Sequence, residues 1–180
     1  MKQKGLILFS VVITVMLLFS CGGGTSSKPA KATPLPASEI EPGAGEMWLG
    51  DVDGTATAGG TFTTKLYINT GKQKIAAYGV YVYYDDTMMT IDTAIGNAGI
   101  SEGTDGFVAA VNPNEPGRVM ISGFDVYGKG PGKELHLATI NWKAKKAGKT
   151  DLRVEVDKLT DETTIDVGNP IGKSTSITIN

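Results

Sequence analysis

Few side chains in this sequence have the chemistry of a metal site or a catalytic centre. The 180 residues contain one Cys, Cys21, and one His, His136. A structural zinc site takes about four Cys or His ligands, and a nucleophilic triad needs its His beside a nucleophile and an acid. Asp51-Val52-Asp53-Gly54 begins like a calcium loop but does not complete one. We therefore expect no metal site, a strand-end turn at Asp51–Gly54, and a surface or packed strand position for His136.

Carboxylates are the remaining candidates for catalysis. Two of them placed across a cleft could hydrolyse a glycosidic bond. The candidates are Asp85, Asp86, Asp92, Asp161 and Glu162. Neighbouring residues on a strand point to opposite faces, so the adjacent acids do not form such a pair. We expect a chain that is not an enzyme and needs no cofactor.

Cys21 has a different chemical role because of where it stands. Residues 1–20 carry a short basic start and then the apolar run Leu6–Phe19. As a helix, 5–20 would span about 24 Å, less than the ~30 Å hydrocarbon core, so residues 1–20 read as a secretory signal. Leu18-Phe19-Ser20-Cys21 resembles a bacterial lipobox, which implies lipid attachment at Cys21. The expectation is an exported chain, lipid-anchored at the cell envelope.

The residues that follow Cys21 separate this anchor from a folded domain. Gly22 lacks the Asp that retains some lipoproteins at the inner membrane, so a host with two membranes would carry the chain at the outer one. Residues 21–46 are rich in Gly, Ser, Thr and Pro and poor in large apolar residues, which predicts a flexible tether. The folded domain is expected over 47–180. The net charge of −2 gives no electrostatic basis for nucleic-acid binding.

The tyrosines of 78–84 are the candidates for recognition. At a period of two, Tyr78, Val80, Val82 and Tyr84 share one face and Gly79, Tyr81 and Tyr83 share the other. With the apolar set buried, Tyr81 and Tyr83 would face outward as a pair. Two readings stay open: a strand face covered by a loop, and an aromatic surface that binds a partner.

These residues must be positioned by an all-β fold. Turn signals recur every 8–12 residues or so, and we count about nine strands and no helical period. The strongest turn signal is 112–117, and a change of phase near Ala138 predicts either a bulge or a strand buried on both faces. We expect two antiparallel sheets packed face to face as a β-sandwich.

Two motifs in 47–180 carry a resemblance to a known family. The first is Val80-x-Val82-x-Tyr84-Asp85 with the apolar corner Met88-Met89, and the second is Leu137-Ala138-Thr139-Ile140-Asn141-Trp142 followed by a Lys/Gly turn and a strand at Thr150. Their order and spacing resemble cohesin modules, the binding modules of cellulosome scaffolds.

The resemblance implies a nine-stranded antiparallel β-sandwich with jelly-roll topology. It also implies dockerin-bearing partners, bound on the sheet that carries the third, fifth, sixth and eighth strands. Ala77 and Gly79 stand where several cohesins place polar contact residues. The function implied is a surface-anchored, non-catalytic protein-binding module. The alternatives are a carbohydrate-binding module that stacks Tyr81 and Tyr83 on polysaccharide, and a structural envelope lipoprotein.

Overall fold

The computed structural model describes residues 41, 43–108 and 110–180. The expected signal sequence at 1–20, the expected lipid attachment at Cys21 and most of the expected tether at 21–46 lie outside these residues. No helix in the described part of the chain is long and apolar enough to cross a lipid bilayer. What is described is all-β, as predicted, and its strands form two sheets.

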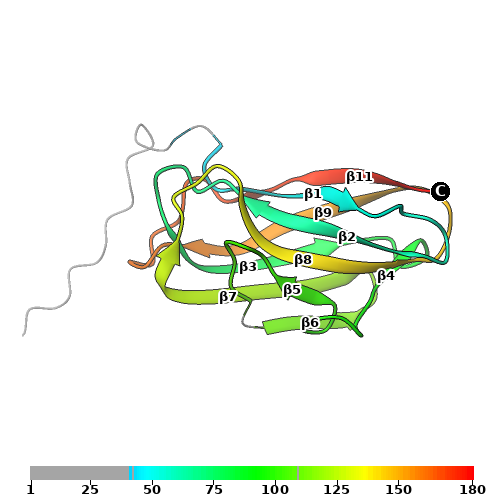
Figure 1. Cartoon of the computed structure of the whole chain (residues 1–180). Helices are drawn as coiled ribbons and strands as arrows, with labels where there is room; N and C mark the ends of the chain where they lie inside the picture. Colours follow the sequence, from blue (N-terminus) through cyan, green and yellow to red (C-terminus); the bar gives the residue numbers. More distant parts are fainter. Residues whose placement is uncertain (1–40, 42, 109) are drawn as a thin grey trace, which may run out of the picture. The chain divides into compact units, whose positions relative to one another are not determined.

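The first sheet has the strand order β10-β1-β2-β8-β4, with β5 paired to β8. Its strands are β1 (Glu46–Asp53), β2 (Thr61–Ile68), β4 (Met89–Ile91), β5 (Ile100–Glu102), β8 (Leu135–Ala144) and β10 (Ile171–Gly172). The second sheet has the order β11-β9-β3-β7-β6. Its strands are β3 (Ile75–Tyr83), β6 (Ala110–Glu115), β7 (Arg118–Lys129), β9 (Gly148–Thr160) and β11 (Ser174–Ile179). Figure 1 shows the strands running lengthwise, with β6 and β11 at opposite margins.

The core lies between the sheets and is filled by the inward residues of each strand. On β3, Tyr78, Val80 and Val82 are at most 2 % exposed, which confirms the predicted alternation. Tyr84 is half-buried and packs edge-on against Trp142, with ring centroids 5.2 Å apart. Burial of this apolar surface is the main stabilising contribution to the fold.

Buried polar atoms of the core side chains have hydrogen-bond partners. Trp142 is fully buried, and its Nε1–H donates to Thr64 Oγ1 at 2.9 Å. The Tyr78 hydroxyl donates to the carbonyl oxygen of Phe107 at 2.9 Å. Burial, and to a smaller degree the charge of Glu102, raises the pKa of Tyr78, so its phenol stays protonated and able to donate. The first bond joins β8 to β2 within the first sheet, and the second joins β3 of the second sheet to the 103–108 segment.

The structure confirms the predicted bulge on β8. Leu66 of β2 pairs with Ala138 and Tyr67 pairs with His136, so Leu137 is the extra residue. Both Leu137 and Ala138 are buried. The change of phase in the sequence therefore marks a real interruption of the ladder.

The strand boundaries differ from expectation at three places. The described residues form eleven strands, because the short strands β5 and β10 were not anticipated, and β10 pairs with β1 in parallel. The predicted turn at 112–117 is wrong in extent, since β6 runs to Glu115 and only Pro116-Gly117 turn. Packing also begins before residue 47: Glu46 is the first residue of β1 and Ala44 is buried.

Candidate functional site

The outward face of β3 carries the tyrosine pair. Ala77, Gly79, Tyr81 and Tyr83 alternate with the core residues, and both tyrosines are half-buried. Their ring centroids are 6.3 Å apart and the ring planes are inclined by 46°. The strand is hydrogen-bonded to β7 on one side and to β9 on the other. Recognition on this face must therefore use side chains, because the backbone of β3 is already paired.

An arginine stands on each side of Tyr83. The register pairs Tyr83 with Arg118 of β7 and with Arg153 of β9. The Arg153 guanidinium lies 3.9 Å from the centroid of the Tyr83 ring, and that of Arg118 lies 4.8 Å from the centroid of Tyr81. Each such cation–π contact contributes about 0.5–1 kcal/mol at an exposed site. The stacking fixes the orientation of both long side chains.

Each arginine is also paired with a glutamate. Arg118 Nη2 lies 2.6 Å from Glu115 Oε1, and Arg153 Nη1 lies 2.7 Å from Glu155 Oε2. The pKa of Arg118 is raised, first by hydrogen bonding to Tyr83 and further by Glu115. The pKa of Arg153 is raised, first by hydrogen bonding to Glu155 and further by Tyr83. Both guanidinium groups stay charged at any physiological pH.

Between Tyr81 and Ala77, the outward face of β3 carries only small side chains, and the larger side chain of Phe124 on β7 stands at its far end. Gly79 pairs with Ser122 of β7 and with Lys158 of β9, and Ala77 pairs with Phe124, so the small side chains of Ala77, Gly79 and Ser122 form a floor between larger neighbours. At about 3.3 Å per residue, this floor extends roughly 13 Å from Tyr81 to the level of Ala77. A shallow pocket of about 70 Å³ opens beside Tyr81 and is lined by Asn112, Glu115, Arg118 and Met120.

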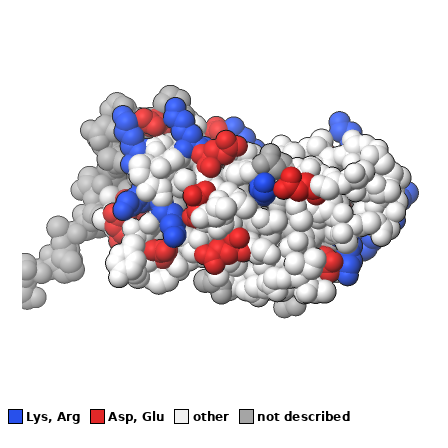
Figure 2. All heavy atoms as spheres, in the orientation of Figure 1, with Lys and Arg blue, Asp and Glu red and all other residues white. Residues whose placement is uncertain are grey.

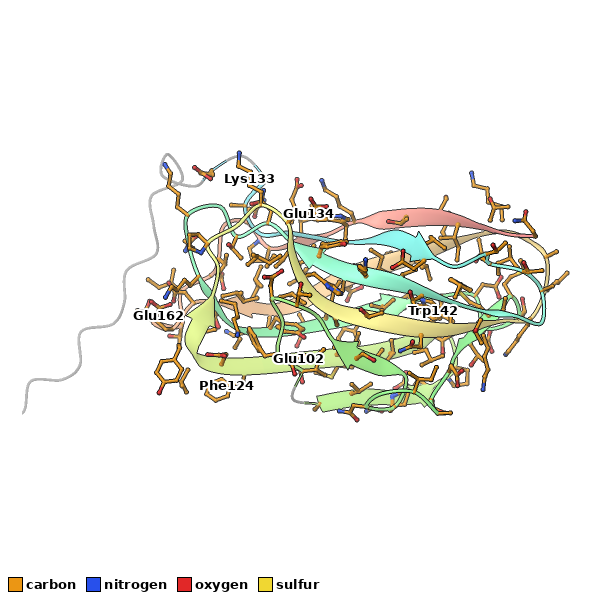
Figure 3. All side chains as sticks on the ribbon, viewed as in Figure 1. Glu102, Phe124, Lys133, Glu134, Trp142 and Glu162 are labelled. Atoms are coloured by element: carbon orange, nitrogen blue, oxygen red, sulfur yellow. The ribbon has the colours of Figure 1, made fainter. Side chains whose placement is uncertain are left out.

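A group of exposed apolar side chains stands at the far end of this floor. Phe124 is 65 % exposed, Val126 is 62 % exposed and Tyr127 is 84 % exposed. Figure 3 shows the Phe124 ring projecting away from the ribbon of β7. Four residues of β7, 125–128, face a single residue of β3 here, and Asp125 Oδ1 accepts a hydrogen bond from the Tyr127 amide at 2.8 Å. This bulge lifts the group out of the sheet.

Comparison with solved structures shows which fold this is. A cohesin module of Clostridium acetobutylicum, solved in complex with a dockerin, matches with 19 % identity and a TM-score of 0.61 over 75 % of this chain and 99 % of that one. The sixth cohesin of scaffoldin B from Acetivibrio cellulolyticus matches with 14 % identity and a TM-score of 0.61 over 77 % and 99 %.

A third match is the cohesin module of a family 33 glycoside hydrolase from Clostridium perfringens, with 18 % identity and a TM-score of 0.59 over 76 % of this chain and 97 % of that one. The chain has the cohesin fold. No protein-family model matches the sequence, and no curated protein sequence does either.

The cohesin fold brings together the strands that the resemblance singled out. The third, fifth, sixth and eighth strands, expected at 78–84, 107–111, 118–124 and from Thr150 onward, correspond to β3, β6, β7 and β9. All four lie in the five-stranded sheet. Its outward face is the one that carries Tyr81 and Tyr83. We call this outward face, with Tyr81, Tyr83, Arg118, Arg153 and Phe124, the tyrosine–arginine face.

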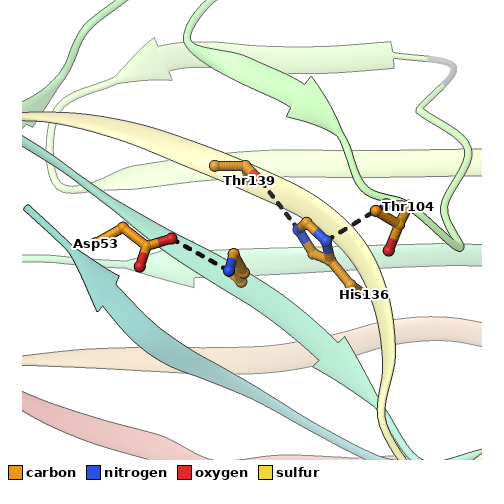
Figure 4. Close-up of polar contacts among 5 residues, drawn as sticks. Asp53, Thr104, His136 and Thr139 are labelled. Carbon is orange, nitrogen blue, oxygen red and sulfur yellow. Dashed lines mark hydrogen bonds and ion pairs between the residues drawn. The ribbon is translucent and has the colours of Figure 1, made fainter.

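The other candidates from the sequence are structural. Asp53 is the last residue of β1 and pairs with Lys65 at 3.1 Å, and Gly54 follows with a φ of 90°. Within the described ranges, no three His, Cys, Asp or Glu side chains are grouped to hold a metal ion. His136 is half-buried, with Nε2 2.9 Å from Thr139 Oγ1 and Nδ1 accepting from the Thr104 amide at 3.4 Å (Figure 4). These contacts give His136 a packing role.

The acids considered for catalysis are spread over turns and ion pairs. Asp85 accepts hydrogen bonds from Thr87 at 2.6 and 2.9 Å, and Asp161 accepts in the same way from Thr163. Asp92 pairs with Lys143 at 2.9 Å. Carboxylates that cap turns or neutralise a lysine stabilise the local structure, and this is the role that the contacts give to Asp85, Asp92 and Asp161.

A row of rings also crosses the opposite sheet. Trp48 and Tyr67 are stacked with centroids 5.8 Å apart, and Tyr67 lies 5.6 Å from the His136 ring. Tyr67 is only 8 % exposed, so the middle of this row is packed and offers little ring surface to a ligand. The tyrosine–arginine face is the better candidate for recognition.

Sequence reasoning placed Tyr81 and Tyr83 outward but did not assign Arg118, Arg153 or Phe124 to the same face. A signal was present in the strand at 118–124, where Arg118 and Phe124 share a parity opposite to the buried Val119. The alternation gives the side of the sheet. It does not give the register that sets Arg118 and Arg153 on either side of Tyr83.

Proposed function

We propose that this chain is a non-catalytic protein-binding module that takes a dockerin-type partner on its tyrosine–arginine face. The observation that carries the proposal is the position of this face: it lies on the cohesin sheet built from β3, β6, β7 and β9. Two of the structural neighbours were solved in complex with dockerins. Rigid aromatic and arginine side chains are also the types enriched among residues that dominate binding energies.

The face has the features of a broad contact surface rather than a catalytic cleft. Its aromatic and arginine side chains are held in place by stacking and ion pairs, which lowers the entropy lost on binding. Phe124 adds an exposed apolar contact at the far end. A partner that reaches from Tyr83 to Phe124 would cover roughly 20 Å along the strands.

Polysaccharide binding by the tyrosine pair is less well supported. Stacking on successive sugar rings needs aromatic faces that are open and close to coplanar. Here the rings are inclined by 46°, and a guanidinium covers part of each tyrosine. We therefore propose a protein partner and treat polysaccharide binding as an outcome of the test.

Dockerin modules encoded by the same genome provide the test. Isothermal titration calorimetry with the chain, in calcium and then in EDTA, should find at least one calcium-dependent partner. The Tyr81→Ala/Tyr83→Ala variant should weaken that binding at least tenfold, because hot-spot residues contribute about 2 kcal/mol or more each. The control is Thr61→Ala, an exposed change on the other sheet. Binding that survives the double change, or that depends on Thr61, would place the site elsewhere.

The proposal includes display at the cell envelope. Cys21 would carry the lipid, and residues 21–46 would hold the folded domain away from the membrane. This part rests on the lipobox-like segment alone. Membrane fractionation of wild type and Cys21→Ser tests it, since the variant should be lost from the membrane fraction.

A further inference from the structure

Tyr83 lies in the middle of a row of three side chains that crosses three strands. Arg118 and Arg153 are its direct neighbours on β7 and β9. Two strand spacings separate the arginine backbones, which is about 9.6 Å. Both guanidinium groups reach toward the tyrosines from opposite sides, and hydrogen bonding to Tyr83 contributes to the raised pKa of each arginine.

The ion pairs of this row do not use all of its donors. A guanidinium presents five N–H donors, and each pair here joins one nitrogen to one carboxylate oxygen. Glu115 continues the row on the edge strand β6, directly opposite Arg118, and Glu155 lies two residues from Arg153 on β9, opposite Tyr81. Arg153 is stacked on the Tyr83 ring, Arg118 lies over the Tyr81 ring, and both guanidinium groups hydrogen-bond to Tyr83, so the two positive groups flank the Tyr83 hydroxyl.

Each guanidinium group is stacked on a tyrosine ring and bonded to a glutamate through one nitrogen, so its other N–H groups are held in position to bind a planar anion. Arginine matches the geometry of a carboxylate through parallel N–H donors, which lysine does not offer. The row and its two glutamates are neutral in sum, and Figure 2 shows acidic and basic residues interspersed on the face in view. An anion would therefore be recognised by direct contact rather than drawn in by a broad positive field.

From the guanidinium donors that these ion pairs leave unused, we infer that the partner places an Asp or Glu carboxylate at the Tyr83 hydroxyl, accepting hydrogen bonds from both Arg118 and Arg153. The inference rests on the proposed function, because it names the chemistry of the partner at the same face. The partner's apolar side chains would then fill the low floor toward Phe124. Backbone pairing with the partner is excluded at this row, since β3 is bonded on both sides.

Selection with a displayed library tests this chemistry without a known partner. The probe is a phage-displayed two-helix scaffold, randomised at its exposed helix positions and selected on the full chain. Counter-selection on Tyr81→Ala/Tyr83→Ala retains clones that bind the tyrosine–arginine face. We expect Asp or Glu to be enriched at one position, and the selected clones to bind Arg118→Gln and Arg153→Gln ten- to a hundredfold more weakly.

Matched variants separate geometry from charge. Lys149→Gln removes one cation from β9, four residues from Arg153, and should change affinity less than threefold. Arg118→Lys and Arg153→Lys keep the charge but lose the planar fork, so they should recover only part of the binding. Circular dichroism melts confirm that each variant is folded before its affinity is compared.

Each result then has a distinct meaning. Clones that need Tyr81 and Tyr83 but show no acidic enrichment and no loss on Arg→Gln overturn the carboxylate inference and leave the proposed face intact. If no clone depends on the tyrosines, the proposed function itself fails. Polygalacturonate is the second probe: if it binds with the same arginine dependence, the carboxylate comes from a polysaccharide and a protein source is refuted.

Discussion

Val82 and Tyr81 are neighbours on β3, and changing each to Ala should affect different properties. Val82 is fully buried, whereas Tyr81 is half-buried on the outward face. Val82→Ala should lower the free energy of unfolding and leave partner binding by the folded protein unchanged. Tyr81→Ala should weaken binding and have the smaller effect on stability.

The magnitude for Val82 follows from its burial. The substitution removes two methyl groups, each contributing about 0.8 kcal/mol by transfer out of water. The cavity left behind adds about 24 cal/mol per Å³, or roughly 1 kcal/mol if about 40 Å³ remains unfilled. The expected loss is therefore about 2–3 kcal/mol. Tyr81→Ala removes partial burial and one exposed cation–π contact, and should cost about 1 kcal/mol.

Urea unfolding followed by far-ultraviolet circular dichroism measures both values. The denaturant slope should be the same for wild type and both variants, so that the midpoints can be compared directly. A larger loss for Tyr81→Ala than for Val82→Ala would mean that the facing of β3 is inverted, and the tyrosine–arginine face could not be the binding site.

Three other perturbations address the core, the acid response and the anchor. Tyr78→Phe leaves the buried Phe107 carbonyl without its donor and should cost about 1–3 kcal/mol in the same urea assay, so wild-type stability would contradict this bond. Hydrogen bonding to Lys143, aided by the Ala94 amide, lowers the pKa of Asp92. Because the folded pKa is lowered, the ionised carboxylate stabilises the fold above its unfolded pKa of about 4, and this contribution is lost as pH falls through the folded pKa. Asp92→Asn should therefore flatten the acid loss of stability between about pH 5 and 2, and an unchanged pH profile would refute the assignment. Mass spectrometry of the mature protein should find residues 1–20 removed and lipid on Cys21; an intact signal sequence would disprove the anchor.

Period-two alternation made the core of this fold predictable. Along β3 it separates Val80 and Val82 from Tyr81 and Tyr83, because a strand has only two faces and one of them must be apolar. The break in phase at Ala138 located a bulge for the same reason. These signals are local, so a single sequence contains them in full.

The extent of β6 could not be predicted because it depends on where the strand lies in the sheet. Pro113 cannot donate to a ladder and therefore indicated a turn, yet β6 is an edge strand and tolerates a missing donor. The actual turn is Pro116-Gly117, where Gly117 has a φ of 77°. Turn chemistry identified the region, and tertiary position decided its limits.

The positions of the arginines relative to the tyrosines could not be predicted from the sequence for a related reason. A bulge on β9 leaves Asp157 between the residues paired with Gly79 and Val80, and beyond this bulge the register sets Arg153 opposite Tyr83. A shift of one residue would turn the guanidinium into the core. Sequence alternation assigns a side chain to a face, but only the assembled sheet decides which side chains become neighbours.

The guanidinium groups that lie over Tyr81 and Tyr83 also matter when no partner is present. Two uncovered tyrosines beside an exposed phenylalanine would form an exposed apolar patch that favours self-association. The arginines cover part of both rings with charge, and the glutamates keep the patch neutral, so it attracts neither anionic surfaces nor other apolar proteins strongly. A face built in this way keeps its aromatic side chains in fixed positions without exposing both ring surfaces to other molecules.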